Sequence, residues 1–454
     1  MKKITIELAQ HTPMLHFDRT PGATLRATEV KPKLDRFLIK NLFRDPNVYS
    51  GFLIPETNAL DYKMRIKSST GAIGTWEKKP PMYFGDIDPQ KENPKYKSMG
   101  MDSERHREYI KKMDEYKENL KEWEKTKEGE KPVPPFPEPT TIELLITCKD
   151  LSSWLDNHTA EFRQCLSAFF FETNFGTRQT KGYGCFFPVK INGIPTNFDS
   201  FMSWYKLIHG SKHKVFHFPL IADANKHDII NNIMEKVQWF YQSLRQGINR
   251  HDRGLYIKPM IFLYAKSKGI QWEKKAIKDK FYNNANISDN AKAIKPVLGL
   301  SSNETWKLTD NNEENKIFNT VELGNEGFDR VPSPLTFKVF QRTLKDYDVY
   351  IILNEELMSR MRTDILGKPL SIEVSKLEEI NNKKTKRNVG IMELPIIEKF
   401  DWQDFLIFVR GRTIVIEEFE KKKKERKQKK EYQKSLEENI YDTLNNIYST
   451  IRMI

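Results

Sequence analysis

The chain has 454 residues, 38% hydrophobic and 30% charged, and its 75 Lys and Arg outnumber 62 Asp and Glu to give a formal net charge of +13. This length predicts two or three globular domains, and the basic balance, with a pI near 9.2, predicts a polyanionic partner, RNA or DNA first. No run approaches the roughly 18 apolar residues of a membrane span, and a charge interrupts what would have to be the apolar part of a signal peptide, so we expect a cytoplasmic protein without a membrane partner.

Cysteine and histidine usage gives no sign of a metal site. The three cysteines share no close spacing and lie in apolar surroundings, so we expect buried thiols. They are Cys148, Cys165 and Cys185. The histidines between His209 and His217 recur at every fourth position, but they run into an expected strand and would not share one helical face. We therefore expect no metal site.

Residues 22–40 form the first functional pattern. A strand is expected at residues 4–8, and an amphipathic helix follows it. Thr28 suits its N-cap, Glu29 favours the positive end of the helix dipole, and Pro32 suits the first turn. Its expected buried face consists of Val30, Leu34, Phe37 and Leu38, and its opposite face carries Lys33, Arg36 and Lys40. A strand, a loop with Arg26 and a basic helix N-terminus can bind phosphate, although the same order begins many ordinary α+β domains.

An insertion is expected after the next strand. Residues 59–67 alternate as a strand does, with Lys63, Arg65 and Lys67 on one face. Prolines and charges then bracket residues 76–139, which we interpret as inserted. Within them, residues 103–125 predict a charged helix with an apolar seam. The seam consists of Tyr109, Met113, Tyr116, Leu120 and Trp123. It would dock on its parent domain or on a neighbouring subunit.

A glycine-rich loop at residues 174–184 is the second functional pattern. It follows a buried strand at 140–148 and a helix from about residue 156 or 159 to 171, and a strand at 185–191 follows it. The loop contains Gly176, Arg178, Lys181, Gly182 and Gly184. Its glycines let the backbone approach a ligand, and its two cations would reach phosphates. A nucleotide P-loop is excluded because G-K-[ST] is lacking and the helix precedes the glycines. A plain glycine-rich hairpin is the alternative.

The second half repeats the order of strand then helix. A strand at 215–221 and a helix at 225–245 echo the opening and hint at a duplication, although the opening motif itself does not recur. Residues 250–330 hold Asn-rich and Glu-rich runs that we interpret as loops or another insertion. Further expected elements are strands at 331–340 and 347–353 and a short helix at 401–410.

Residues 413–454 predict a basic helical tail. Eight of the ten residues from Lys421 to Lys430 are Lys or Arg, which is typical of a solvated helix face or a flexible arm. An apolar stripe beyond this run predicts a docked helix. The stripe consists of Leu436, Ile440, Leu444, Ile447 and Ile451. We place the domain borders at 1–205, 206–412 and 413–454.

Three segments together resemble one family. Residues 25–37 (L-R-A-T-E-V-K-P-K-L-D-R-F) resemble the stretch that opens the first helix in RAMP proteins, the RNA-binding subunits of type III CRISPR effector complexes. The loop at residues 175–186 is similar to the glycine-rich loop of this family, in the form that looks most like subunit one of the type III-B Cmr complex. The run at residues 332–335 is similar to the Ser-Pro-Leu that begins a strand in the second half of that subunit.

The resemblance implies an α+β fold of two ferredoxin-like (RRM-like) RAMP domains, β-α-β-β-α-β. The residue patterns add the helical insertions and the basic C-terminal helical tail to this fold. It implies that the sheet faces and the glycine-rich loop contact RNA, and that there is no cofactor. The implied partners are CRISPR guide RNA, target RNA, other RAMP subunits and the large polymerase-like subunit of the Cmr complex. The implied role is antiviral: the subunit lies at the end distal to the 5′ tag of the guide, contacts the 3′ region of the guide or the target, and helps target capture.

The residue patterns and the resemblance agree on a phosphate-binding site that does not read sequence. The expected RNA-binding residues are Arg26, Lys31, Lys33, Arg36, Gly176, Arg178, Lys181, Gly182, Tyr183 and Gly184. Tyr183 would either stack on an unpaired base or pack on the sheet.

Two alternative functions remain beside RNA binding without catalysis. Related RAMP subunits cut target RNA with an Asp between the first strand and the first helix. Asp18 would fill that role here and hold a divalent metal at the scissile phosphate, and His16 or His11 would act as general base. The other alternative is a structural assembly subunit whose basic surface meets acidic partners without contacting RNA. No catalytic residue is favoured.

Overall fold

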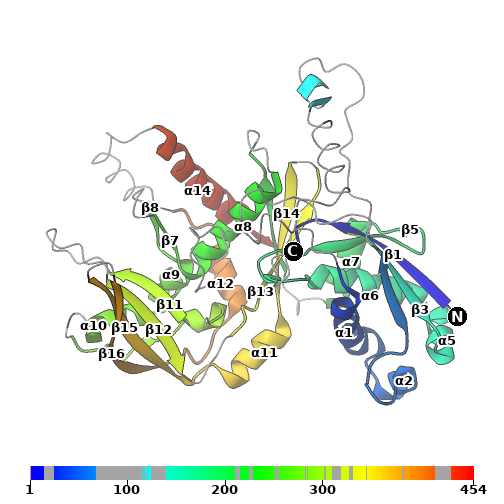
Figure 1. Ribbon diagram of the computed structural model, residues 1–454, viewed down its shortest axis with the longest axis horizontal. Helices are drawn as coiled ribbons and strands as arrows, with labels where there is room; N and C mark the ends of the chain where they lie inside the picture. The colour runs from blue at the N-terminus through cyan, green and yellow to red at the C-terminus, as the bar shows by residue number, and fades with distance from the viewer. Residues whose placement is uncertain are drawn as a thin grey trace. The chain divides into compact units, whose positions relative to one another are not determined.

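The computed structural model describes residues 2–14, 25–67, 115, 118–119, 121–123, 140–209, 215–223, 229–250, 255–281, 283, 285–300, 303–308, 319–326, 331–343, 345–380, 383–414 and 431–454. Helices and strands are mixed along the chain, which confirms the α+β class (Figure 1). Unit 1, the first of two compact units, comprises Met1–Lys212, Ala222–Asn231 and Phe337–Val349. Unit 2 comprises His213–Ile221, Asn232–Thr336 and Tyr350–Ile454. The domain borders expected from the sequence stay a prediction.

Unit 1 contains a five-stranded sheet with the order β2-β3-β1-β4-β5. Its strands are β1 (Lys2–Gln10), β2 (Lys63–Lys67), β3 (Thr140–Ile146), β4 (Phe186–Ile191) and β5 (Ile194–Pro195). β1 is antiparallel to both β3 and β4, and Ile6 lies opposite Ile142 and Ile191. Because side chains alternate along a strand, one face of the sheet is apolar and the other is polar. The four longer strands confirm the strands expected there.

Helices α1 (Ala27–Leu38) and α6 (Thr159–Glu172) share one hydrophobic core with the apolar face of this sheet. They contribute Val30, Leu34 and Leu38 from α1, and Phe162, Leu166, Phe169 and Phe170 from α6. Burying a side chain of this size stabilises the fold by roughly 1.5–3 kcal/mol. The unit also contains a π-helical turn at Ile39–Phe43, α2 (Pro46–Tyr49), a 3-10 turn at Ser50–Phe52, α5 (Lys149–Asn157) and α7 (Phe198–His209).

The start of α1 differs from the prediction. The N-cap is Arg26, in extended conformation with φ −113° and ψ 137°, and it makes no side-chain cap hydrogen bond. Thr28 is therefore inside the first turn, and Pro32 lies in the helix interior. The Arg26 carbonyl accepts hydrogen bonds from the backbone N–H groups of Glu29 and Val30. The prediction of a Thr28 cap was wrong because tertiary contacts of Glu29, described below, hold this end of the helix.

A second sheet has the order β13-β14-β6-β17. Its strands are β6 (Val215–Ile221), β13 (Leu335–Gln341), β14 (Asp346–Leu353) and β17 (Arg452–Met453). Counted along the chain, they stand in the order second, third, first, fourth, as β2, β3, β1 and β4 do in the first sheet. This shared order is the regularity that the repeated strand and helix suggested.

Unit 2 contains the long amphipathic helix α14 (Glu431–Thr450) and, from Asn232 onward, most of a second one, α8 (Ile229–Arg245). Their buried apolar positions include Ile233, Val237 and Phe240 on α8, and Ile440, Leu444 and Ile447 on α14. The docked helix expected at the end of the tail is therefore confirmed. The basic run from Lys421 to Lys430 lies outside the described residues.

The rest of unit 2 shows that residues 250–330 are not all loops, whereas the alternative of an insertion there stays a prediction. Residues 250–330, interpreted as loops or an insertion, include α9 (Met260–Ser267), α10 (Glu273–Phe281), β11 (Asn303–Leu308) and β12 (Asn319–Glu326). The last two join β15 (Pro369–Ile380) and β16 (Lys383–Pro395) in a sheet with the order β11-β12-β15-β16. Smaller elements are β7 (Ile248–Arg250), β8 (Leu255–Ile257), β9 (Gln271–Trp272), β10 (Ala291–Lys292), a 3-10 turn at Lys295–Leu298, and α11 (Glu355–Asp364). The short helix α12 (Trp402–Val409) confirms the expected one, and the Asp401 side chain caps it.

Most of the expected insertion at residues 76–139 lies outside the described residues. Glu115, Glu118–Asn119 and Lys121–Trp123 are described and helical, inside the range where a helix was expected. Among the described helices, none combines the length and apolar character needed to cross a bilayer.

Candidate functional site

The two functional patterns of the sequence meet in unit 1. The Glu29 carboxylate near the start of α1 accepts a hydrogen bond from the backbone N–H of Gly176 at 2.6 Å. The Lys33 ammonium group lies 3.3 Å from the same carboxylate. It also donates to the Asn174 carbonyl at 3.3 Å and to Oε1 of Gln179 at 3.2 Å. Helix α1 and the glycine-rich loop are thus held together by one small polar cluster.

The glycines of the loop are required by its backbone. Gly176, Gly182 and Gly184 have φ angles of 79°, 83° and 68°, in the region that residues with a Cβ rarely adopt. A Cβ added to Gly184 would lie 1.9 Å from the Phe175 carbonyl oxygen. Arg178 adopts a φ of 58° without being glycine. The backbone conformation of the loop therefore requires glycine at these three positions.

A buried lysine lies beneath the loop. Lys338, in the middle of β13, is 0% exposed. Its ammonium group donates to the Thr173 carbonyl and to Oδ1 of Asn174, both at 2.7 Å. The Asn174 amide then donates to the carbonyls of Gln179 at 2.6 Å and Phe337 at 2.9 Å. This network fixes the entry and the middle of the loop against β13.

The expected cations differ in their surroundings. Arg26 and Arg36 are exposed on α1, whereas Arg178 and Lys181 in the loop are half-buried. The Arg178 guanidinium lies 5.3 Å from the centre of the Tyr183 ring. Burial lowers the pKa of Lys33, and the Glu29 carboxylate partly opposes that shift.

Lys31 has a structural environment. Its ammonium group pairs with Asp35 at 2.7 Å, donates to the Leu60 carbonyl at 2.9 Å, and lies 4.2 Å from the centre of the Tyr62 ring. These partners pull Lys31 toward the segment before β2. Its expected contact with RNA would have to break them.

Two residues with aromatic rings, Tyr183 and His11, lie near the loop. Tyr183 is 3% exposed, and burial raises the pKa of its hydroxyl. Its ring therefore packs inside unit 1, which fits the packing alternative and leaves no face open for base stacking. Burial, with the charge of Lys338, lowers the pKa of His11 to about 3. Its Nδ1 accepts from the Gln341 N–H at 3.2 Å, so His11 is a neutral structural residue and a poor general base.

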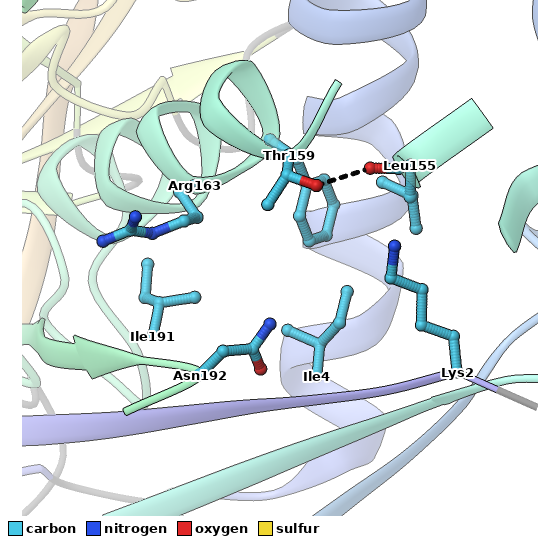
Figure 2. A pocket seen from close by; sticks show the side chains of 8 residues that line it. Lys2, Ile4, Leu155, Thr159, Arg163, Ile191 and Asn192 are labelled. Carbon is cyan, nitrogen blue, oxygen red and sulfur yellow. Dashed lines mark hydrogen bonds between the residues drawn. The ribbon is translucent and has the colours of Figure 1, made fainter. Parts of the chain in front are cut away.

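The alternative catalytic residues, His16 and Asp18, lie outside the described residues. Within the described ranges, no group of three or more His, Cys, Asp and Glu side chains could hold a metal ion. A cavity of about 10 Å³ between β1 and the start of α6 has room for about one water (Figure 2). It is far smaller than the several hundred Å³ typical of a small-molecule site.

The open face of the first sheet is basic. Lys63, Arg65 and Lys67 of the edge strand β2 are exposed on one face, as the alternation predicted. Glu143 on β3 is bound there by Lys3 and Lys67, both at 2.9 Å. These hydrogen bonds lower the pKa of Glu143 to about 2.

Three residues that organise the site were not assigned to it from the sequence: Glu29, Asn174 and Lys338. Glu29 was interpreted as a dipole residue and Asn174 as the start of the loop. Lys338 carried a signal, since it is a lone cation inside the apolar run from Leu335 to Phe340. The sequence gives no indication that β13 passes beneath residues 174–184.

Known protein families now allow a comparison. The Cmr1 N-terminal domain matches residues 1–105 and 95–248, and the Cmr1 C-terminal domain matches residues 256–435. No similar sequence was found among curated proteins. Among solved structures, a chain from the cryo-EM structure of type III-B Cmr-beta bound to cognate target RNA and AMPPnP, in the presence of ssDNA, is 8% identical. The alignment covers 77% of this chain and 94% of that chain, and its TM-score of 0.31 is too low to show a shared fold. The two Cmr1 domain matches span most of the sequence and confirm the resemblance drawn from it, so the chain belongs to the Cmr1 family of RAMP-type subunits.

Proposed function

We propose that this chain is a non-catalytic RNA-binding subunit of a type III-B Cmr effector complex. The observation that carries the proposal is the junction of α1 with the glycine-rich loop, joined by Glu29, Lys33 and Gly176. Membership of the Cmr1 family supports the assignment to the complex. The proposed partners are guide RNA, target RNA, other RAMP subunits and the large polymerase-like subunit. The proposed role is to contact the 3′ region of the guide or the target and to help target capture.

The chemistry of the junction suits an RNA backbone. Arg26 is the N-cap of α1, Arg36 lies in its last turn, and Arg178 and Lys181 lie in the glycine-rich loop. A guanidinium group binds two oxygens of one phosphate, and an ammonium group binds as a point charge. Contacts of either kind to phosphate do not depend on the base, which suits a subunit that must accept any guide sequence. Lys33 is bound to Glu29 and is expected to add positive potential more than direct contact.

We also propose that the chain contains two ferredoxin-like domains at residues 1–205 and 206–412, followed by the tail at 413–454. The support is the strand order of two sheets, the five-stranded sheet β2-β3-β1-β4-β5 and the four-stranded sheet β13-β14-β6-β17. In both, the strands stand in the order second, third, first, fourth along the chain, which is the order of a β-α-β-β-α-β fold.

The test compares three double variants that each remove two positive charges. The loop variant is Arg178→Gln with Lys181→Gln, the helix variant is Arg26→Gln with Arg36→Gln, and the control is Lys206→Gln with Lys266→Gln. The control lysines are exposed on α7 and α9. RNA affinity of the full chain would be measured by fluorescence anisotropy between about 50 and 200 mM salt, the range over which phosphate contacts change affinity steeply.

We expect the loop and helix variants each to lose about 1.4 from the slope of log K against log salt, since each phosphate contact to single-stranded RNA contributes about 0.7. The control pair should keep the slope of the unmodified chain. Equal slopes in all four proteins would show that the junction does not bind RNA. Cleavage of the RNA in Mg²⁺ or Mn²⁺ that is lost in Asp18→Ala would contradict the non-catalytic part of the proposal.

The open face of the first sheet favours assembly as a second candidate function. Its cations alternate with carboxylates, because Glu143 binds Lys3 and Lys67 and Glu7 lies 3.4 Å from Lys190. Such mixed charge suits a protein surface better than a uniformly negative backbone. A Lys63→Glu and Arg65→Glu variant that keeps RNA affinity but no longer co-purifies with the other Cmr subunits after nuclease treatment would support this role. Loss of RNA affinity in the same variant would assign the face to RNA.

A further inference from the structure

Lys338 is an unusual residue for the interior of a protein. It is 0% exposed, and both groups that accept its hydrogen bonds, the Thr173 carbonyl and the Asn174 side-chain oxygen, are neutral. Burying an ammonium group without a carboxylate partner costs free energy that an apolar residue would avoid. The side chains of Thr336 and Phe340, which share its face of β13, are also buried and uncharged. Packing alone therefore does not explain a lysine here.

The contacts of Lys338 lead to the loop. Lys338 orients Asn174, and the Asn174 amide binds the carbonyl of Gln179, which follows Arg178 directly. The Gln179 amide binds the Gly176 carbonyl at 2.6 Å. The backbone of Phe337, the neighbour of Lys338 on β13, donates to the Thr180 carbonyl at 3.2 Å. The conformation that presents Arg178 and Lys181 is thus set from below by β13.

The surroundings of Lys338 are rich in charge. The titratable and charged groups on the elements packed around it are His11 after β1, Glu29 and Lys33 on α1, Arg178, Lys181 and Cys185 in and after the loop, and Arg342 and Asp348 on the β13–β14 hairpin. Burial lowers the pKa of Lys338 to about 8; Cys185 opposes this shift and Lys33 adds to it. An anion bound on the loop would favour the protonated lysine.

We propose that Lys338 is a positioning residue for RNA, whose buried positive charge holds the glycine-rich loop in its binding conformation and couples RNA binding to the uptake of a proton. The inference rests on the proposed function, because it concerns the same junction of α1 and the loop. Lys338 does not touch RNA itself. It acts through Asn174 and through its charge beneath the loop.

The pH dependence of RNA affinity distinguishes this proton coupling from a purely structural role of Lys338. The pKa of Lys338 is lowered in the folded chain, so the unfolded chain holds this proton more tightly, and this group favours folding increasingly as pH rises from about 8 toward 10.5. RNA binding requires the protonated form, so affinity falls over the same range. Stability and affinity are therefore expected to change in opposite directions above pH 8.

The experiment measures the RNA affinity of the full chain from neutral pH to about one pH unit above the pKa of Lys338. The RNA contains only A and C, because these bases do not titrate in this range. We expect affinity to fall about tenfold, because one pH unit above a pKa changes the protonated fraction by that factor. Calorimetry in two buffers of different ionisation enthalpy should detect proton uptake on binding. Lys338→Arg, which cannot deprotonate, should flatten the profile, whereas Lys206→Arg on the exposed side of α7 should leave the profile unchanged.

A measurement without RNA accompanies these. Lys338→Met should speed hydrogen exchange at the amides of Gly176 and Gly184 in the free chain if Lys338 holds the loop. Salt-sensitive RNA binding with a flat pH profile in the unmodified chain would overturn the inference while leaving the proposed function intact. A chain that binds no RNA would overturn both. The pH profile of the unmodified chain needs no variant, so a failure of Lys338→Met to fold would not prevent the test.

Discussion

Gly184→Ala tests the geometry of the loop most severely. A methyl group at this position would lie 1.9 Å from the Phe175 carbonyl oxygen, and the residue has a φ of 68°. The left-handed conformation costs a residue with a Cβ roughly 1–2 kcal/mol. The clash is with backbone, so the two hydrogen bonds of Gly184, to the Pro13 carbonyl at 2.8 Å and from the Phe175 N–H at 3.0 Å, must also lengthen or break. Each lost hydrogen bond costs about 1 kcal/mol, so together with the conformational cost Gly184→Ala should lower the free energy of unfolding by about 3–4 kcal/mol.

Gly193→Ala is the matched control. Gly193 has a φ of 73° but no atom within 4 Å of an added Cβ, so only the conformational cost of about 1–2 kcal/mol remains. At roughly 2–4 °C for each kcal/mol, thermal unfolding followed by circular dichroism should show a Tm lower by about 10 °C for Gly184→Ala and by about 4 °C for Gly193→Ala. RNA affinity should fall in the first variant alone. Equal shifts in the two variants would refute the tight approach of the loop to Phe175.

Two pH-dependent predictions concern the carboxylates of Glu143 and Glu172 in unit 1. Hydrogen bonds from Lys3 and Lys67 lower the pKa of Glu143 to about 2, so its contribution to stability is present above its ordinary pKa and is lost as pH falls toward 2. Glu143→Gln should therefore lower the urea midpoint at neutral pH and leave it unchanged near pH 2, and an equal loss at both would contradict the ion-pair account. Burial raises the pKa of Glu172 to about 7, although its hydrogen bond from Tyr205, 2.9 Å long, opposes the shift. The folded chain then holds a proton that the unfolded chain releases, so stability falls as pH rises from 4.5 to 7. Glu172→Gln should remove this dependence of stability on pH. A variant that keeps it would show that another group is responsible.

The sequence predicted the local parts of the site well because their signals are local. The spacing of Val30, Leu34 and Leu38 defined the buried face of α1, and the glycines marked the loop whose φ angles demand them. Alternation placed Lys63, Arg65 and Lys67 on one exposed face. These patterns depend on side chains within a few residues of one another, which a single sequence displays.

Long-range contacts account for what the sequence did not reveal. Thr28 lost the N-cap to Arg26 because Glu29 is held by Gly176, 147 positions further along the chain. The sequence does not distinguish stacking of Tyr183 on RNA from packing, because its burial depends on tertiary contacts. The role of Lys338 depends on its contact with Asn174, 164 positions away in the sequence. The Asn-rich and Glu-rich runs within residues 250–330 predict loops or another insertion, yet β11 and β12 form there. Pairing of β11 with β12, and of β12 with β15, overrides the weak strand propensity of these residues.

The central claim is that RNA lies on the junction of α1 and the glycine-rich loop. Hydrogen exchange of the full chain, measured by mass spectrometry with and without RNA, tests it most directly. The account predicts that RNA slows exchange in peptides that span residues 25–31 and 174–185, while peptides from α9 and α12 keep the exchange rates of the free chain. Protection confined to other segments, with residues 174–185 unchanged, would contradict it.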